Sequence, residues 1–141
     1  MTRRSQRLRR VLRKYELDAR MVRLETAKAE RERNALSATA RRLDAARSGI
    51  LFENRAMTGD QLAALGEWSE RLLAASIAIQ PSIQNAEVTF REAVQDMRQA
   101  KGRVERIEER ILRTSRIEDR LREDRTAIGK SLPKAKQEPQ P

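Results

Sequence analysis

Apolar residues recur at every seventh position over the first third of the chain and predict a long helix with one packing stripe. Seven-residue steps from Leu8 to Ile50 meet only apolar residues. A second row, offset by four positions, is weaker and contains polar residues such as Thr26 and Arg33. Two rows with this spacing form the seam of a coiled coil. The first row consists of Leu8, Tyr15, Val22, Ala29, Leu36, Leu43 and Ile50.

The same spacing returns after residue 60 and predicts a second helix. Its two rows start at Leu62 and Leu65 and continue to Ile111 and Ile107. Thr58 followed by Gln61 is a capping-box pattern, so this helix is expected to begin near residue 59. Pro81 removes one backbone donor and crowds the preceding turn, so it is expected to kink or break the helix. The expected segments are helix 1 over about 4–55, a turn over 56–59 and helix 2 over about 59–129.

A connection this short makes the two helices antiparallel neighbours. The predicted fold is therefore all-α, a long antiparallel two-helix coiled-coil hairpin over residues 1–129, followed by a disordered tail at 130–141. Facing residues are predicted to have numbers that add to 115 or 116, which places Leu43 opposite Leu72 and Thr26 opposite Phe90. Under this register helix 2 extends past its partner beyond about residue 113, with Ile117, Leu121 and Ile128 in the overhang.

The composition argues against a globular enzyme. Charged residues make up 37% of the chain and aromatic residues 3%, which leaves little bulky material for a three-dimensional core. The chain has no cysteine and no histidine, which excludes disulfides, thiolate metal sites and the commonest general base. It also lacks a glycine-rich phosphate loop, a membrane-length apolar run and a signal peptide. We expect a soluble cytoplasmic protein with no catalytic residues, no cofactor and no metal.

The net charge of +10 is unevenly distributed. Residues 1–55 carry a net +9, residues 56–97 a net −4 and residues 98–141 a net +5. The basic N-terminal helix has three interpretations, namely a solvated face, a docking surface for an acidic protein, or a set of phosphate contacts. The absence of interleaved aromatic residues argues against nucleic acid. The basic residues of this segment are Arg3, Arg4, Arg7, Arg9, Arg10, Arg13 and Lys14.

Trp68 is the single tryptophan and lies beside the seam, with Leu73 on the other flank. One interpretation is that Trp68 covers the seam near the turn. The other is that it is an exposed anchor for a partner, because tryptophan is enriched at interface hot spots.

Several segments together resemble the FliJ family of flagellar type III export proteins and its injectisome counterpart, the YscO-like proteins. These segments are the basic-apolar stretch Arg7 to Leu12, the Leu-Glu-x-Ala-x-Ala-Glu stretch Leu24 to Glu30, and a turn with Asn54 and Met57 that leads to Trp68. A second helix rich in Glu and Arg and a tail rich in Lys, Pro and Gln complete the similarity, which covers nearly the whole chain. Pro81 departs from the smooth rod of the family.

The resemblance implies a non-enzymatic cytoplasmic protein, peripheral at the inner-membrane export apparatus and involved in flagellum biogenesis, chemotaxis or type III secretion. Family members form an antiparallel coiled coil similar to the γ subunit of rotary ATPases. They bind the hexameric export ATPase at the end that carries both chain termini, and they contact the membrane export gate and the export chaperones. On this basis we assign Arg4, Arg7, Arg9, Arg10, Ile117, Leu121 and Ile128 to the ATPase, and Trp68 and Leu73 to the gate or a chaperone.

The competing interpretation is a basic coiled-coil scaffold or a nucleic-acid-associated protein. The sequence leaves open the oligomeric state, the choice between flagellum and injectisome, and which end binds which partner.

Overall fold

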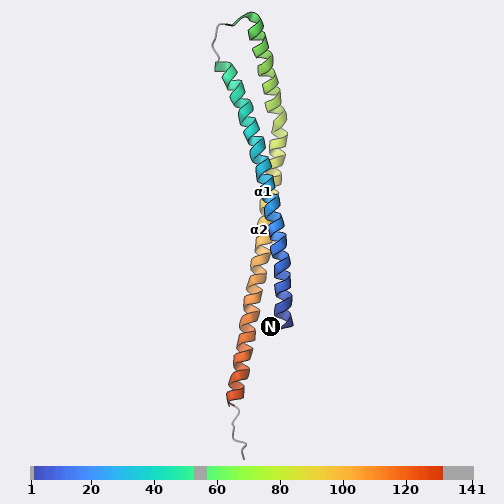
Figure 1. Cartoon of the computed structure of the whole chain (residues 1–141), viewed down its shortest axis with the longest axis vertical. Helices are drawn as coiled ribbons and strands as arrows, with labels where there is room; N and C mark the ends of the chain where they lie inside the picture. Colours follow the sequence, from blue (N-terminus) through green and yellow to red (C-terminus); the bar gives the residue numbers. More distant parts are fainter. Residues whose placement is uncertain (1, 53–56, 132–141) are drawn as a thin grey trace, which may run out of the picture. The chain divides into compact units, whose positions relative to one another are not determined.

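The computed structural model describes residues 2–52 and 57–131, which form two α-helices and no strand. These helices are α1 (Arg3–Phe52) and α2 (Gly59–Ser131) (Figure 1). They pack against each other as an antiparallel pair, so the predicted all-α hairpin is confirmed. The predicted end of helix 1 at 53–55, part of the turn, and residues 132–141 of the tail lie outside the described residues. Residues 130 and 131, predicted as tail, belong to α2.

The start of α2 is fixed by the predicted capping box. The backbone N–H of Thr58 donates to Oε1 of Gln61 at 3.2 Å, and the backbone N–H of Gln61 donates to Oγ1 of Thr58 at 3.4 Å. The two side chains thus satisfy two backbone donors that the first helical turn leaves without a partner. Asp60, in the same turn, adds a favourable charge at the positive end of the helix dipole.

Helix α2 continues without interruption through Pro81, which excludes a break there, and the alternative of a kink stays a prediction. Pro81 is exposed, on the side of the helix away from the seam. The carbonyl of Ile77, four residues earlier, loses its helical donor, but on this side of the helix water can replace it. The helix therefore tolerates proline here at the cost of one backbone hydrogen bond.

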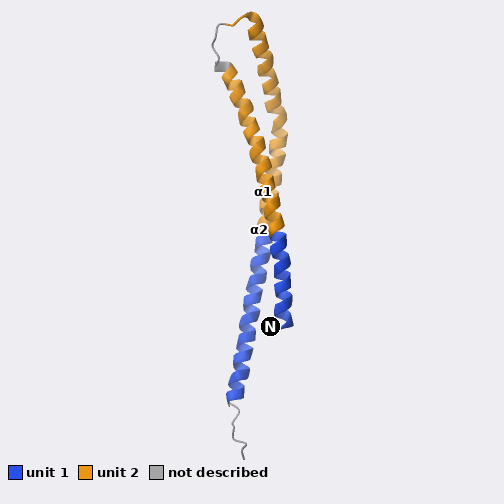
Figure 2. Ribbon diagram, in the orientation of Figure 1, with its two compact units in different colours: residues 1–19, 100–141 blue, residues 20–99 orange. Residues whose placement is uncertain are grey.

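The chain divides into two compact units, which are described separately (Figure 2). Unit 1 comprises residues 1–19 and 100–141, and unit 2 comprises residues 20–99. Among the described residues, those buried in unit 1 are Ser5, Ala100 and Ile107, and those buried in unit 2 are Thr26, Ala29, Leu72 and Ser76. All but one of the seam residues from Leu8 to Ile111 are buried or half-buried, and the exception, Leu62, is 59% exposed. The cores are narrow seams, as expected for two paired helices.

Contacts across the seam show that the predicted register is wrong by about one helical turn. In unit 2, Oγ1 of Thr26 donates to the carbonyl of Ala93 at 3.2 Å, a pair whose numbers add to 119. In unit 1, Oγ of Ser5 donates to Oε1 of Glu118 at 2.7 Å, and these numbers add to 123. For the polar contacts between the two helices in the described residues, the residue numbers add to between 119 and 123. These sums are all above the predicted 115 or 116.

The physical reason lies in the alternating steps of the seam. Along α1 the seam advances by four residues and then by three, and along α2, followed backwards, it does the same. With a sum of 119, each four-residue step along α1 lies opposite a four-residue step along α2. Facing seam residues therefore stay at the same height along the helix axes. The sums 115 and 116 pair each step of four with a step of three. Both choices place most apolar seam residues opposite apolar ones, so the apolar pattern alone does not separate them.

The corrected register shortens the predicted overhang. Helix 2 was expected to have no partner on helix 1 beyond residue 113. Glu118 lies beyond that point, yet it accepts a hydrogen bond from Ser5 of α1. The residues of α2 that are exposed without interruption are 119–130. Ile117, predicted to lie in the overhang, therefore has α1 beside it.

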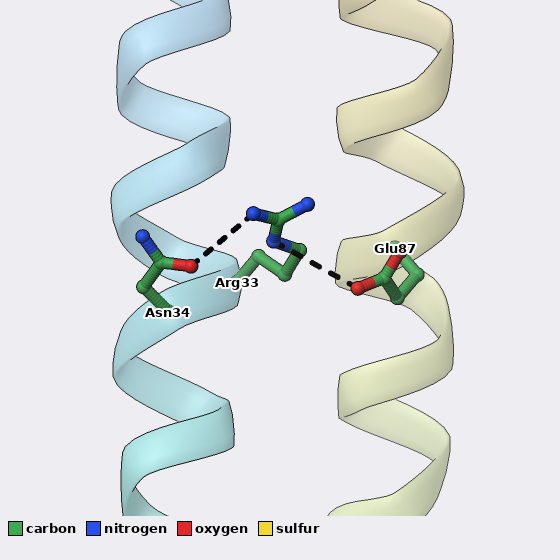
Figure 3. Close-up of polar contacts among 3 residues, drawn as sticks. All are labelled: Arg33, Asn34 and Glu87. Carbon is green, nitrogen blue, oxygen red and sulfur yellow. Dashed lines mark hydrogen bonds and ion pairs between the residues drawn. The ribbon is translucent and has the colours of Figure 1, made fainter.

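Arg33 occupies a seam position in unit 2 and has three neighbours, of which Figure 3 shows Asn34 and Glu87. Its Nε lies 3.7 Å from Oε1 of Glu87, and its Nη2 donates to Oδ1 of Asn34 at 3.3 Å. Its guanidinium carbon lies 4.1 Å from the centroid of the Phe90 ring, within the range of a cation–π contact. A half-buried charge is tolerated in a seam when it is paired in this way.

The register can be tested with cysteine pairs, because the natural chain has no cysteine. We expect Leu43→Cys to form a disulfide with Ser76→Cys, whose numbers add to 119, faster than with Leu72→Cys, the partner expected from 115. Residues 72 and 76 lie one turn apart on α2, so the second pair is a matched control for helix position. The measurement is the rate of intramolecular disulfide formation by non-reducing electrophoresis. Faster disulfide formation between positions 43 and 72 would instead support the register in which facing residue numbers add to 115.

Candidate partner-docking groove

A groove of about 440 Å³ lies in unit 1, where the first turn of α1 meets α2. It combines guanidinium groups with apolar side chains, and it is open to solvent along one flank of the seam. Ile117 and Leu121 are 57% and 51% exposed, so much of their apolar surface is available to a partner. The groove is lined by Thr2, Arg4, Arg110, Arg113, Thr114, Ile117, Glu118 and Leu121.

Two hydroxyl groups at the N-terminal end of α1 bind the carboxylate of Glu118, which lines the groove. The hydroxyls of Thr2 and Ser5 both donate to Oε1 of Glu118, Ser5 at 2.7 Å. Thr2 also caps α1, because its Oγ1 accepts the backbone N–H of Ser5 at 3.3 Å. A single carboxylate of α2 therefore binds both the capping residue and the first turn of α1.

Hydrogen bonds from Thr2, and then from Ser5, lower the pKa of the Glu118 carboxyl below its usual value of 4.5, and the charge of Arg122 acts in the same direction. A lowered pKa means that the ionised form binds its hydroxyl partners better than the protonated form does. The contact therefore stabilises the folded chain fully above the unfolded-state pKa. That contribution is lost as the pH falls through the lower folded-state pKa.

The Glu118 contact predicts a pH-dependent difference in melting temperature. At pH 7 the natural chain is expected to melt higher than the Glu118→Gln variant. The difference should disappear as the pH falls well below 4.5, because Glu118 is then neutral in both the folded and unfolded states. Thermal melts followed by circular dichroism at several pH values measure it. A difference that is constant down to low pH would show that the carboxylate charge contributes nothing.

The structure brings three of the predicted ATPase-binding residues together. Arg4, Ile117 and Leu121 line the same groove. Ile128 is 60% exposed but lies further along α2 and does not line the groove. The remaining predicted residues, Arg7, Arg9 and Arg10, are exposed on α1 and also lie outside the lining.

Sequence reasoning did not select the other lining residues, which are Thr2, Arg110, Arg113, Thr114 and Glu118. Glu118 carried a usable signal, because it continues the seven-residue row through Val104 and Ile111 and so occupies a seam position. A carboxylate at such a position needs a polar partner. The hydroxyl residue Ser5 likewise continues a seam row of α1, backwards from Leu12.

Trp68 and Leu73 lie in unit 2 and do not form one patch. Trp68 is 52% exposed and Leu73 is 40% exposed, so each presents part of its side chain to solvent. Five residues apart on one helix, they point to opposite flanks of the seam. Any partner that uses both must reach around α2.

Among the residues that the structure describes, no group of three or more acidic side chains is arranged to hold a metal ion. Neither helix contains, in its described part, an apolar stretch long enough to cross a membrane. The groove offers guanidinium, hydroxyl and apolar groups, which can bind a partner.

No protein-family model, no curated protein and no solved structure matches this chain. The resemblance to the FliJ family therefore rests on the sequence segments that carry it.

Proposed function

We propose that this chain is a non-enzymatic component of a flagellar or other type III export apparatus and docks on the export ATPase ring through the groove of unit 1. The single observation that carries the proposal is this groove, in which Arg4, Ile117 and Leu121 converge at the N-terminal end of α1. It adds a physical basis to the resemblance, which implies binding at the end that carries both termini.

The groove suits an acidic surface with a protruding apolar side chain. Burial of Ile117 and Leu121 against a partner would supply most of the affinity, since apolar burial contributes roughly 25 cal/mol per Å². The guanidinium groups of Arg4, Arg110 and Arg113 would accelerate association and select an acidic partner. This division of roles is typical of interfaces with an apolar centre and a charged rim.

Trp68 is the proposed anchor for the export gate or a chaperone, with Leu73 as a second contact. Its half-exposed indole lies in the acidic part of the chain, away from the basic groove residues in sequence. Tryptophan contributes large contact area at a low entropic cost, which makes it a frequent hot spot. We place the working protein in the cytoplasm, peripheral to the inner-membrane export apparatus.

Two variants separate the proposed partners. We expect Leu121→Asp to lose binding to the ATPase and keep the gate and chaperone, because a carboxylate in the apolar part of the groove opposes burial. We expect Trp68→Ala to show the reverse. Pull-downs with each purified partner measure both, with circular dichroism as the folding control. Leu112→Asp, also in unit 1 and 57% exposed but outside the groove, is the matched control for the first variant.

The outcomes distinguish the candidate functions. If Leu112→Asp also loses binding to the ATPase, the added negative charge, and not a change in the groove, explains the loss in Leu121→Asp. Retention of every partner by both test variants would contradict the assignment of both sites. Salt-dependent DNA binding by a chain with no affinity for the ATPase would favour the nucleic-acid-associated alternative.

A further inference from the structure

The charged residues of unit 1 are distributed unequally between the two flanks of its seam. On both helices, a residue that immediately precedes a seam residue lies on one side of the seam, here called the preceding flank. A residue that immediately follows one lies on the other, the following flank. The groove demonstrates that the preceding flanks of both helices open on the same side, because Arg4 of α1 and Arg110, Arg113 and Ile117 of α2 line it together.

The preceding flank of unit 1 is strongly basic, and its basic residues are here called the basic face. On α2 these residues recur every three or four positions from Arg103 to Arg113, and Arg120 continues the row after Ile117. The same flank carries only two acidic residues, Asp18 and Asp124. The basic face consists of Arg4, Arg7 and Lys14 on α1 and Arg103, Arg106, Arg110, Arg113 and Arg120 on α2.

The following flank of the same unit is balanced. Its four basic residues, Arg9, Arg13, Lys101 and Arg122, are matched by four acidic residues, Glu16, Glu105, Glu108 and Asp119. A chain that is basic for solubility alone gains nothing from placing its excess charge on one side. The one-sided arrangement instead indicates that this side meets an extended anionic surface.

The basic face is not neutralised within the described part of the chain. Its one ion pair joins Arg113 to Glu109 at 3.9 Å, with both side chains largely exposed, and such a pair contributes little. Arg106 donates from Nε to the carbonyl of Gly102 at 3.2 Å, which leaves the rest of its guanidinium group available. The remaining guanidinium groups lie in solvent, ready to bind phosphate oxygens in a bidentate manner.

Apolar side chains on the same flank identify the kind of anionic surface. Val11 and Ile117 occupy the same rows as Arg4 and Arg110 and are 37% and 57% exposed. A nucleic acid backbone gains nothing from such side chains, and this flank has no aromatic residue for stacking on bases. At a lipid surface, arginine binds the headgroup phosphates while neighbouring apolar side chains enter the layer below them.

We propose that the basic face of unit 1 binds the surface of a membrane that contains anionic phospholipids. The row of arginines lies along the headgroup phosphates, and Val11 and Ile117 insert between them. This activity does not depend on the proposed export function, because it requires only this chain and lipid.

The test is flotation of the purified full chain with vesicles of phosphatidylglycerol and phosphatidylcholine in equal parts, and with vesicles of phosphatidylcholine alone. We expect binding to the first only, weakening as salt is raised. The variant R106Q/R110Q/R113Q should bind on the order of 100-fold more weakly, at roughly fivefold for each basic residue near the anionic surface. The control R13Q/K101Q/R122Q removes the same number of charges from the following flank and should retain most of the binding.

Three results would overturn the proposal. The first is no binding to the anionic vesicles at low salt. The second is an equal loss in the two triple variants with helicity intact, which would mean that only net charge matters. The third is equal or tighter binding to a short DNA duplex, unchanged by Ile117→Asn, which would assign the basic face to nucleic acid. The flotation assay contains no ATPase, so a lack of vesicle binding would not contradict the proposed docking on the ATPase. Conversely, a lack of ATPase binding would not contradict the proposed membrane binding.

Discussion

Replacing Leu72 with alanine is expected to lower the free energy of unfolding by about 3 kcal/mol. Leu72 is 7% exposed and is the largest buried apolar side chain among the described residues of unit 2. A two-helix seam has few other side chains to fill the space, so the truncation removes apolar burial and leaves a cavity or a collapsed seam. Urea unfolding followed by circular dichroism at 222 nm, the standard helix signal, measures the loss.

The matched control is Leu62→Ala, the same chemical change on the same helix. Leu62 is 59% exposed although its heptad position predicted a place in the seam. We expect it to change the free energy of unfolding by at most about 0.5 kcal/mol. Similar losses in the two variants would mean that burial along the seam does not determine stability.

Reversing Arg4, Arg7, Arg9 and Arg10 to glutamate is expected to weaken binding to the export ATPase on the order of 100-fold at low salt, if each charge contributes roughly 0.7 kcal/mol. All four side chains are exposed, so helicity should be unchanged. Glutamate near the start of α1 is also favourable for the helix dipole. The loss should shrink as salt is raised, because exposed charges are screened.

Four basic residues further along α1 provide the control for net charge. Arg20, Arg23, Lys28 and Arg31 are exposed and belong to unit 2. Their reversal to glutamate changes the net charge by the same amount and should leave ATPase affinity within a few fold. Equal loss in both variants, measured by calorimetry, would indicate long-range attraction without a defined site.

The sequence predicts the two helices, their packing faces and the start of α2 because each depends on local spacing. Thr58 and Gln61 are three residues apart, and their capping box follows from that spacing. The register of the pair was predicted one turn away, because a shift of one turn still places most apolar seam residues opposite apolar ones. The contact between Thr26 and Ala93 breaks this ambiguity, and it is visible only once the helices are paired.

The groove was predicted only in part for the same reason. Arg4, Ile117 and Leu121 were selected by charge and apolar pattern on separate helices, and the structure brings them together. Glu118 was not predicted as a site residue, because a polar residue in a seam row weakens the heptad pattern. Its partner Ser5 is more than one hundred residues away in sequence, so the pairing depends on the register.

The central claim is that the groove of unit 1 docks on the export ATPase, and calorimetric titration of the full chain with the purified ATPase tests it most directly. We predict a saturable complex at low salt that weakens as salt is raised and is abolished by Leu121→Asp. No detectable binding at low salt, or a complex that Leu121→Asp leaves unchanged, would contradict the claim.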